Sequence, residues 1–248
     1  MIFRARRREP WSVASHAASR TMVSESLEFL ASVRNYNHWM ARTIAPYVGQ
    51  RLLELGCGTG NILEYFLLRE RLFGIDLDPG MVEFCRERFR AHTNCDFAAA
   101  DVLREVVALD FAPDSVLSLN VLEHVEDDRA LLRWQVDQLS PGGRLIALVP
   151  AHPVIYGELD AVAGHVRRYT KGELVAKVEG TGLRVTHCFY FNAVGFFGWG
   201  LNARLLRRRE LPRQQAHFYD HHVVPLQSWL EGIVRPPFGQ SLIVVGQK

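Results

Sequence analysis

The sequence predicts an α/β fold built on a parallel, doubly wound sheet. Short apolar runs alternate with helical patterns five times over residues 51–149. A glycine-rich turn at 56–60 follows the first run, and Asp76 closes the second. Because open α/β sheets bind ligands at the carboxyl ends of their strands, we expect a ligand site at these two strand ends.

Composition indicates one soluble domain with a full core, since the 248 residues are 48% hydrophobic and 23% charged. The net charge of +2 does not indicate a polyanionic partner, so we expect no nucleic acid. The cysteines form no C-x-x-C or Cys/His pattern, which favours a reduced cytoplasm and gives no zinc site. We therefore expect a cytoplasmic protein without a metal.

The first 22 residues are basic, with five arginines against the single acid Glu9. Their composition is like that of a transit peptide, but they lack the apolar region of a secretory signal. We interpret residues 1–22 as a disordered leader and 23–248 as a single domain. No apolar run reaches the roughly 18 residues that a transmembrane helix needs.

A helix is predicted ahead of the first strand, from a cap at Ser24 or Ser26 to about Ile44, where Pro46 ends it. Residues 52–55 then form a short buried strand, and the next helix is expected over 61–70.

The glycines of the turn allow the backbone to bend sharply and a ligand to come close. A dinucleotide fingerprint requires G-x-G-x-x-G, but Asn61 stands where its third glycine belongs. A P-loop requires Lys-Ser or Lys-Thr after the last glycine, and neither is present.

Residues 54–60 have the pattern E-x-G-x-G-x-G and resemble motif I of class I S-adenosylmethionine (SAM)-dependent methyltransferases. The resemblance implies a Rossmann-like sheet of seven strands whose last strand is antiparallel. It implies SAM as the cofactor and S-adenosylhomocysteine as its product. The motif I residues that it places at the cofactor are Glu54, Gly56, Cys57, Gly58, Gly60 and Asn61.

In this family a helix before the first strand often covers the cofactor, which makes Tyr36 and Asn37 candidate contacts. The alternative is an amphipathic packing helix with an exposed polar face. Asp76 follows the second strand, 72–75, where an acid can accept hydrogen bonds from both ribose hydroxyls. The resemblance places Leu77 against the adenine.

Asp78 and Pro79 are typical of a helix start, so we interpret Asp78 as a cap. The third strand, 95–99, leads to Asp101. The resemblance assigns Asp101 to the adenine amino group and the N–H of Val102 to a ring nitrogen. Asp101 could instead cap the short helix that follows.

The fourth strand, 114–119, is followed by N-V-L-E-H-V, which resembles motif IV of the small-molecule branch. The resemblance implies that Asn120, Val121 and Leu122 line the methionine end of SAM. The residues N-V-L differ from the N-P-P-Y-type tetrad of enzymes that methylate amino groups of nucleic acids. Glu123 and His124 could touch the site or serve as helix-terminal packing and capping.

Later elements complete the expected sheet. We predict helix 126–138, strand 144–149, helix 170–180 with a Thr170 cap, strand 183–191 and strand 241–247. The resemblance places the last strand antiparallel between the fifth and sixth. Residues 192–240 form an insertion where the parent fold needs only a hairpin.

The segment after the fifth strand carries His152, Tyr156, Asp160 and His165, which could accept or steer a proton. Its run G-H-x-R-R-Y-T-x-x-E-L resembles a loop of ubiquinone-pathway O-methyltransferases. We predict His165 as the first candidate for a general base or substrate ligand, ahead of His152 and Tyr156. For each of them, the alternative is a hydrogen bond that anchors the loop.

Arg167 and Arg168 could hold an acidic substrate group or form a solvated surface. The insertion opens with alternating glycines and aromatics, which could wall the substrate pocket, form a homodimer contact or lie on a membrane, the last being the least favoured. The run 217–222, HFYDHH, lacks the H-E-x-x-H spacing, and we interpret it as a polar edge.

The predicted function is methyl transfer from SAM to a small molecule, with an oxygen atom of a bacterial specialised metabolite as the acceptor. Three alternatives stay open: N- or C-methylation of a small molecule, methylation of RNA or protein, and SAM binding without methyl transfer.

Overall fold

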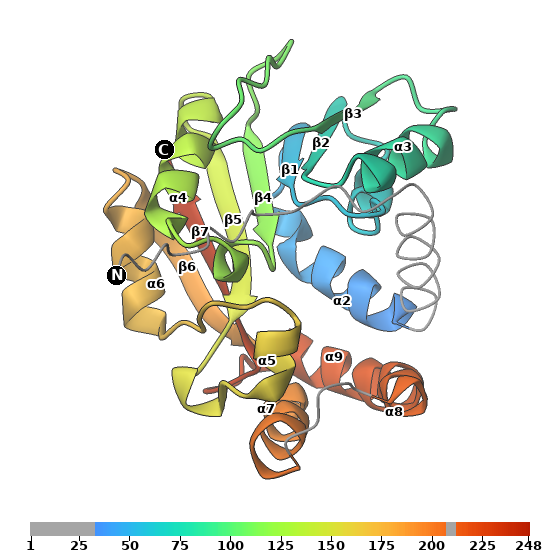
Figure 1. The fold of residues 1–248 in the computed structure, drawn as a ribbon, viewed down its shortest axis with the longest axis vertical. Coiled ribbons are helices and arrows are strands. Elements are labelled where there is room, and N and C mark those ends of the chain that lie inside the picture. Colours follow the sequence, from blue (N-terminus) through green and yellow to red (C-terminus); the bar gives the residue numbers. More distant parts are fainter. Residues whose placement is uncertain (1–32, 207–211) are drawn as a thin grey trace, which may run out of the picture.

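The computed structural model describes residues 33–206 and 212–248 (Figure 1). Their seven strands form one sheet in the order β3-β2-β1-β4-β5-β7-β6, and β7 is antiparallel to both of its neighbours. The strands are β1 Arg51–Leu55, β2 Arg71–Asp76, β3 Cys95–Ala99, β4 Ser115–Leu119, β5 Arg144–Pro150, β6 Arg184–Phe191 and β7 Ser241–Gln247. The expected seven-stranded sheet with an antiparallel last strand is confirmed.

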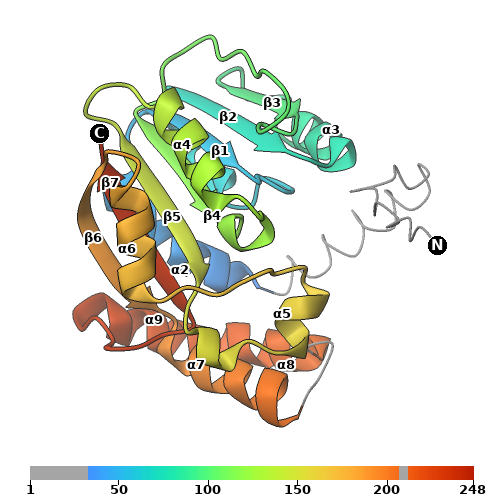
Figure 2. The same ribbon diagram turned by 60° about the vertical axis from the view of Figure 1, so that its left-hand side comes forward.

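Helices cover both faces of the sheet (Figures 1 and 2). Leu52 of β1 is buried in one cluster with Ile44 and Val82, whereas Leu53 is buried with Leu132 on the opposite face. Strand side chains alternate between faces, so one buried strand serves both layers. The helices are α2 Arg34–Ile44, α3 Pro79–Arg88, α4 Asp128–Gln138, α5 Glu158–Val162, α6 Lys171–Glu179, α7 Ala193–Gly200, α8 Arg213–Phe218 and α9 Val224–Ile233.

Side-chain caps fix where two of the predicted helices begin. The Asp78 carboxylate accepts the Gly80 N–H at 2.7 Å at the start of α3, as expected. Thr170 Oγ1 accepts the Glu173 N–H at 3.3 Å at the start of α6. The predicted start of the first helix at Ser24 or Ser26 and the leader 1–22 lie outside the described residues.

The helix predicted over 61–70 is wrong, because the chain forms only a short 3-10 helix, Leu63–Phe66, there. Arg88 of α3 donates to the Thr59 carbonyl at 2.7 Å and to Asn61 Oδ1 at 3.2 Å, and it pairs with Glu64. The side chain expected to begin the helix is therefore bound to α3. A tertiary contact overrides the local signal here.

The insertion folds as a helical layer beyond the carboxyl ends of β5 and β6, beside α5 (Figure 2). It contains α7, α8 and α9, with π-helical turns at Leu201–Leu205 and Tyr219–Val223. Glu231 of α9 accepts the backbone N–H groups of Asn192 at 3.1 Å and Ala193 at 2.8 Å, at the start of α7. Charge-assisted bonds at a helix N-terminus thus join α9 to α7.

The run 217–222 has a structural role that the sequence did not indicate. Asp220 is fully buried and accepts the N–H groups of Asn35 at 3.1 Å and Tyr36 at 2.8 Å, at the start of α2. His217 and His221 stack at 4.0 Å on the exposed side. The insertion thereby caps the helix that precedes the sheet.

Not all aromatics of the insertion turn inward. Trp199 faces the site described below, whereas Phe197 and Trp229 are more than half exposed, at 61% and 58%. None of the helices over 33–206 and 212–248 combines the length and apolar character needed to cross a lipid bilayer. Homodimer and membrane contacts stay predictions.

Candidate functional site

Three non-glycine residues with positive φ stand within two residues of the ends of β4, β5 and β6. Asn120, His152 and Asn192 have φ of 56°, 59° and 67°. Such backbone costs on the order of 1–3 kcal/mol and gathers at functional sites. Because β4, β5 and β6 run parallel, these residues lie on one edge of the sheet, the edge where open α/β sheets bind ligands.

The glycine-rich turn lies at the switch point between β1 and β4. Gly56 has φ of 71°, and a Cβ there would lie 2.5 Å from Val121 Cγ2, so glycine lets the β1 and β4 ends meet. The N–H groups of Gly56 and Cys57 donate to the Ile75 carbonyl at 2.7 and 3.1 Å. The Cys57 side chain is buried in the core, so only its backbone faces the turn.

The other two glycines differ in what surrounds them. A Cβ on Gly60 would lie 2.4 Å from the Phe89 ring, whereas one on Gly58 would meet nothing within 4 Å. The Gly58 N–H donates to Asp76 Oδ2 at 2.8 Å. Gly60 thus serves packing, and Gly58 leaves room for a ligand to approach the backbone. Asn61 is bound to Arg88.

Three side chains beside this turn fit a charged nucleoside. Asp76 ends β2 with a half-buried carboxylate, and the next residue, Leu77, is 63% exposed. Glu54 is buried, and its Oε2 has no hydrogen-bond partner among the described residues. Burial raises the pKa of Glu54 well above its usual range, and Cys85 and Asp76 add to the effect. A polar cationic ligand would compensate this carboxylate, so the residues fit SAM.

Asp101 has the local contacts of a turn cap. Its Oδ1 accepts the Leu103 N–H at 3.1 Å, and its Oδ2 pairs with Arg104 Nε at 3.3 Å. Val102, the neighbour assigned to a ring nitrogen, is buried. Asp101 therefore caps the turn that follows it, as one of the two interpretations expected. The adenine contacts of Asp101 and Val102 stay predictions.

The Tyr36 hydroxyl lies toward the insertion. It bonds with Asn192 and Ser241, at the ends of β6 and β7, and burial is the main reason why its pKa rises to about 12. Its ring packs edge-on against Trp39 and Phe191. Whether Tyr36 also contacts the cofactor stays a prediction.

The three motif IV residues have different environments. Asn120 is exposed, and Val121 lies against Gly56. Leu122 is fully buried, and its carbonyl accepts the Tyr169 hydroxyl at 3.1 Å. Asn120 and Val121 are thus placed at the switch point, and Leu122 anchors the segment to the core.

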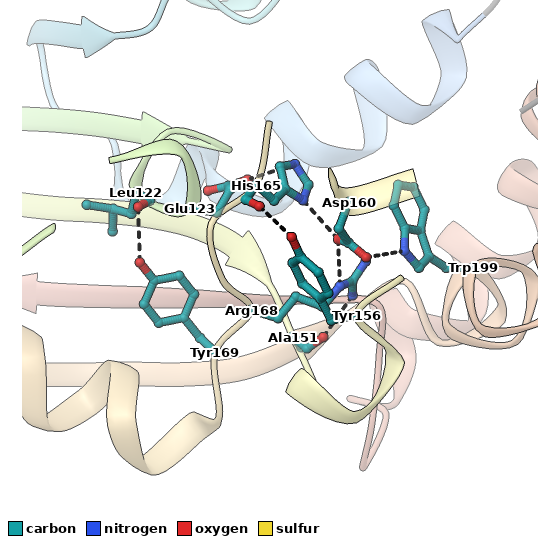
Figure 3. A network of polar contacts seen from close by, with 9 residues as sticks. All are labelled: Leu122, Glu123, Ala151, Tyr156, Asp160, His165, Arg168, Tyr169 and Trp199. Atoms are coloured by element: carbon teal, nitrogen blue, oxygen red, sulfur yellow. Dashed lines mark hydrogen bonds and ion pairs between the residues drawn. The ribbon is translucent and has the colours of Figure 1, made fainter. Parts of the chain in front are cut away.

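A buried carboxylate organises the segment after β5 (Figure 3). Asp160, on α5, has no solvent exposure and binds three side chains: His165 Nδ1 at 2.9 Å, Arg168 Nε at 2.7 Å and Trp199 Nε1 at 3.1 Å. Burial alone would raise the pKa of Asp160, but the His165 bond, the Arg168 charge and the Trp199 bond together lower it. An ionised Asp160 fixes the proton of His165 on Nδ1 and leaves Nε2 as an acceptor.

His165 Nε2 points toward a second carboxylate, that of Glu123. Its Oε1 lies 3.9 Å from His165 Nε2, and the His124 and His165 rings meet edge to face at 4.9 Å. Glu123 is completely buried, and neither of its oxygens has a hydrogen-bond partner among the described residues. Burial raises the pKa of Glu123 to about 8. Glu123 and His124, left open by the sequence, therefore adjoin His165.

Tyr156 positions His165, because its hydroxyl donates to the His165 carbonyl at 2.8 Å. His152 stacks on Tyr190 at 5.0 Å, and burial, helped by the Arg168 charge, lowers its pKa. The His152 Nε2 has no partner among the described residues. The structure thus joins Tyr156 to His165 by a hydrogen bond, whereas His152 lies just after β5 and stacks on Tyr190 of β6.

The alternative of a solvated surface is wrong for Arg168, whereas Arg167 is partly exposed. Arg168 is buried, and its Nη1 donates to the Ala151 carbonyl at 2.9 Å while Nε binds Asp160. Arg167 pairs with Asp128 at 2.8 Å. Both guanidinium groups are bound to acids of this chain. An acidic substrate group would have to reach Arg168 Nη2, which has no partner among the described residues.

Trp199 is the site residue for which the sequence gave no specific role. It hydrogen-bonds Asp160 from a position 39 residues away, on α7, and its ring lies 5.0 Å from the Arg168 guanidinium carbon. The glycine-aromatic run indicated a pocket wall, but no local pattern could identify which of its aromatics reaches the site.

Comparison with known proteins shows that this chain is similar to methyltransferases. Residues 53–145 match a family described as a methyltransferase domain. A ubiquinone biosynthesis O-methyltransferase from Azorhizobium caulinodans is 32% identical over 121 residues, which cover 46% of this chain and 45% of the relative. The chain therefore matches less than half the length of that curated relative.

Solved structures share the fold at low identity. An S-adenosylmethionine-dependent methyltransferase from Mesorhizobium loti aligns with a TM-score of 0.58 and 20% identity, over 84% of this chain and 96% of that one. The N-methyltransferase NodS from Bradyrhizobium japonicum, in complex with S-adenosyl-L-homocysteine, aligns with a TM-score of 0.53 and 16% identity, over 98% of this chain and 93% of that one.

Proposed function

We propose that this chain is a class I SAM-dependent methyltransferase and that it transfers a methyl group from SAM to an oxygen atom of a small molecule. The observation that carries the choice of oxygen is the imidazole of His165, which buried Asp160 holds with Nε2 as a proton acceptor. The relative named above is an O-methyltransferase, which supports the same choice.

The cofactor would lie along the carboxyl ends of β1, β2 and β4. Gly58 offers an open backbone, Asp76 a carboxylate for the ribose hydroxyls and Leu77 an exposed apolar surface. The buried Glu54 carboxylate would compensate positive charge. When bound, SAM supplies a sulfonium methyl group that is already activated for in-line displacement.

The residues of this chain would align the acceptor and remove its proton. A hydroxyl at His165 Nε2 can give its proton to the imidazole as its oxygen takes the methyl group, and Asp160 stabilises the resulting imidazolium. Trp199 holds Asp160 from the opposite side. Because Trp199 belongs to the insertion, that layer also shields the site from water.

The size and position of the insertion support a small acceptor. Its helices lie directly beyond β5 and β6, and its Trp199 is hydrogen-bonded into the site (Figure 2). A polymer end would have to pass this layer to reach His165. We therefore favour an organic metabolite over RNA or protein.

The test uses methyl-labelled SAM and whole extract of the source cells. We expect label in the organic-extractable fraction, and mass spectrometry of that fraction then identifies the acceptor and the methylated atom. Label confined to protein or RNA would contradict a small-molecule acceptor, and a carbon- or nitrogen-methylated product would contradict the choice of oxygen.

A binding experiment tests the cofactor assignment separately. Calorimetry should show SAM binding to the wild type and its loss in Asp76→Ala, with thermal melting to check folding. Asp110→Ala is the matched control, because it also removes an aspartate, but one in the loop between β3 and β4 that pairs with Arg71 at the surface. Equal SAM affinity in wild type and Asp76→Ala would refute the assignment.

A further inference from the structure

We propose that the insertion docks on the surface of a membrane through α9, and that this membrane surface carries anionic lipid headgroups. α9 lies outside residues 53–145, the part of the chain that matches the methyltransferase family. Membrane docking needs neither SAM nor an acceptor, so it is separate from the proposed methyl transfer and can be tested without it.

α9 exposes its apolar side chains and buries its polar ones. Gln227 and Glu231 are buried, at 5% and 8% exposure, together with Val224. Four large apolar side chains point the other way and are 50–65% exposed; we call them the α9 stripe, and they are Leu226, Trp229, Leu230 and Ile233. Since successive residues of an α-helix are about 100° apart, the four fall within about 100° of its circumference. A surface helix of a globular protein ordinarily has the reverse arrangement.

Hydrogen bonds hold α9 in this orientation. The Glu231 carboxylate accepts the backbone N–H groups of Asn192 at 3.1 Å and Ala193 at 2.8 Å. Gln227 Nε2 donates to Glu231 Oε1 at 2.7 Å, and Gln227 Oε1 accepts the Tyr219 hydroxyl at 2.8 Å. A rotation of α9 that buried the stripe would break these bonds and leave polar groups unpaired. The apolar side chains are therefore held toward solvent.

A second, shorter stripe is exposed on α7 and the turn after it. Val194, Phe197 and Leu201 are spaced three and four residues apart, and all three are exposed. α7 and α9 belong to the same outer layer of helices at one end of the molecule (Figure 1). The pocket wall that the sequence favoured accounts for Trp199 but not for these side chains. Exposed apolar surface of this kind indicates a protein or membrane interface.

Two arginines stand beside the α9 stripe. Arg42 of α2 and Arg235, just after α9, are exposed, and both line a cavity of about 420 Å³ between the two helices. Trp229 and Ile233 line the same cavity, so the charges and the stripe meet there. Among the described residues that line it, Glu231 is the one acid, and its carboxylate is bound to N–H groups of α7. The free charge at this cavity is therefore positive.

An anionic lipid surface fits both features. A helix in the membrane interface buries Trp and Leu at the acyl boundary, while arginines bind anionic headgroups. α9 has only ten residues, too few to cross a bilayer, so it would lie on the surface. A second copy of the chain fits less well. A two-fold contact would bring the same arginines together, and α9 carries no acid besides buried Glu231 to pair with them.

The test is flotation of the full chain with vesicles of phosphatidylcholine alone or mixed in equal parts with phosphatidylglycerol. We expect the chain to float with the mixed vesicles and to be released by high salt, which screens the arginines. The double variant Trp229→Ser, Ile233→Ser should bind at least about tenfold more weakly, because it loses apolar area. Arg42→Gln and Arg235→Gln should each weaken binding about fivefold, on mixed vesicles only.

Two variants are matched controls. Leu68→Ser removes a fully exposed apolar side chain far from the insertion in sequence, and Arg133→Gln removes an exposed arginine of α4. α4 packs on the opposite face of the sheet from α2 and α9. Neither change should alter flotation. Because all the substituted side chains are exposed, thermal melting of every variant should match that of the wild type.

Brominated lipid locates the contact, because bromine quenches tryptophan emission at short range. Trp229→Phe keeps an aromatic ring and should still float, but it should lose most of the quenching seen in the wild type. The proposal is overturned if the wild type does not float. It is also overturned if the double serine variant floats as well as the wild type, which would assign binding to another segment such as the basic residues 1–22. A dimer in light scattering that the double variant abolishes, without vesicle binding, would assign the stripe to a second copy and overturn it too.

Discussion

Asp220 joins the insertion to the helix that precedes the sheet, and its removal should destabilise the fold. The carboxylate is fully buried and accepts the N–H groups of Asn35 and Tyr36 at 3.1 and 2.8 Å. These N–H groups belong to the first turn of α2, where backbone donors lack helical partners and the helix dipole favours a negative charge. α2 itself has no capping side-chain bond from the residue before it.

The magnitude follows from these two bonds. Loss of a helix cap costs about 0.5–2 kcal/mol, and hydrogen bonds to charged groups contribute about 1.5–3 kcal/mol each. Because both N–H groups are partly buried, hydrogen bonds to water would replace only part of the lost free energy. We expect Asp220→Ala to lower the free energy of unfolding by about 2–4 kcal/mol. Asp220→Asn, which keeps one acceptor oxygen, should lower it by about half as much.

Urea unfolding followed by tryptophan fluorescence and circular dichroism measures this difference. Trp39, one of five tryptophans, is buried on α2, so unfolding of this helix changes its contribution to the emission. His222→Ala is the matched control in the same turn, and its exposed side chain predicts a change within about 0.5 kcal/mol. If Asp220→Ala is as stable as that control, the reasoning that the insertion caps α2 is refuted.

Three further changes test the turn and two buried networks. Gly58→Ala and Gly142→Ala both place a Cβ at positive φ in open space, so each should lower the free energy of unfolding by about 1 kcal/mol. Only Gly58→Ala should also weaken SAM binding, by at least about tenfold. Burial would raise the pKa of Asp128, but bonds from neighbouring Lys, Tyr and Arg side chains lower it. The ionised carboxylate therefore stabilises the folded protein fully above about pH 4, the pKa in the unfolded chain. This stabilisation is lost as the pH falls through the lower pKa of Asp128 in the folded protein. Asp128→Asn should therefore cost about 2–4 kcal/mol at pH 7 and progressively less below pH 4 in urea titrations. Tyr219→Phe should cost about 1–2 kcal/mol by thermal melting, because its hydroxyl donates to Gln227 Oε1 at 2.8 Å inside the insertion.

Each of these has an outcome that contradicts it. Equal SAM affinities for the two glycine variants would mean that the backbone at Gly58 does not approach the cofactor. A stability difference for Asp128→Asn that stays constant from pH 7 to pH 3 would mean that its carboxylate is not stabilised by its partners. Unchanged melting of Tyr219→Phe would mean that water replaces the hydroxyl at no cost.

The strands and two helix starts could be predicted because their causes are local. Apolar runs of strand length mark β1 to β5, and Asp78 and Thr170 cap helices through atoms only two or three residues away. The failed helix at 61–70 shows the limit. Arg88, some 27 residues from Asn61, binds the very groups that would have begun that helix.

The sequence by itself determined the sheet, the position of the glycine turn and the acids at the carboxyl ends of β1 and β2, because side-chain alternation and the carboxyl-end rule act on neighbouring residues. Only the tertiary structure decided which polar groups share the site. Asp160 reaches Trp199 on α7, and His165 reaches Glu123 after β4, across 39 and 42 residues of chain. Their pairing depends on how loops and the insertion fold over one sheet edge, and burial then sets the charges of these groups. No periodicity in the sequence encodes either effect.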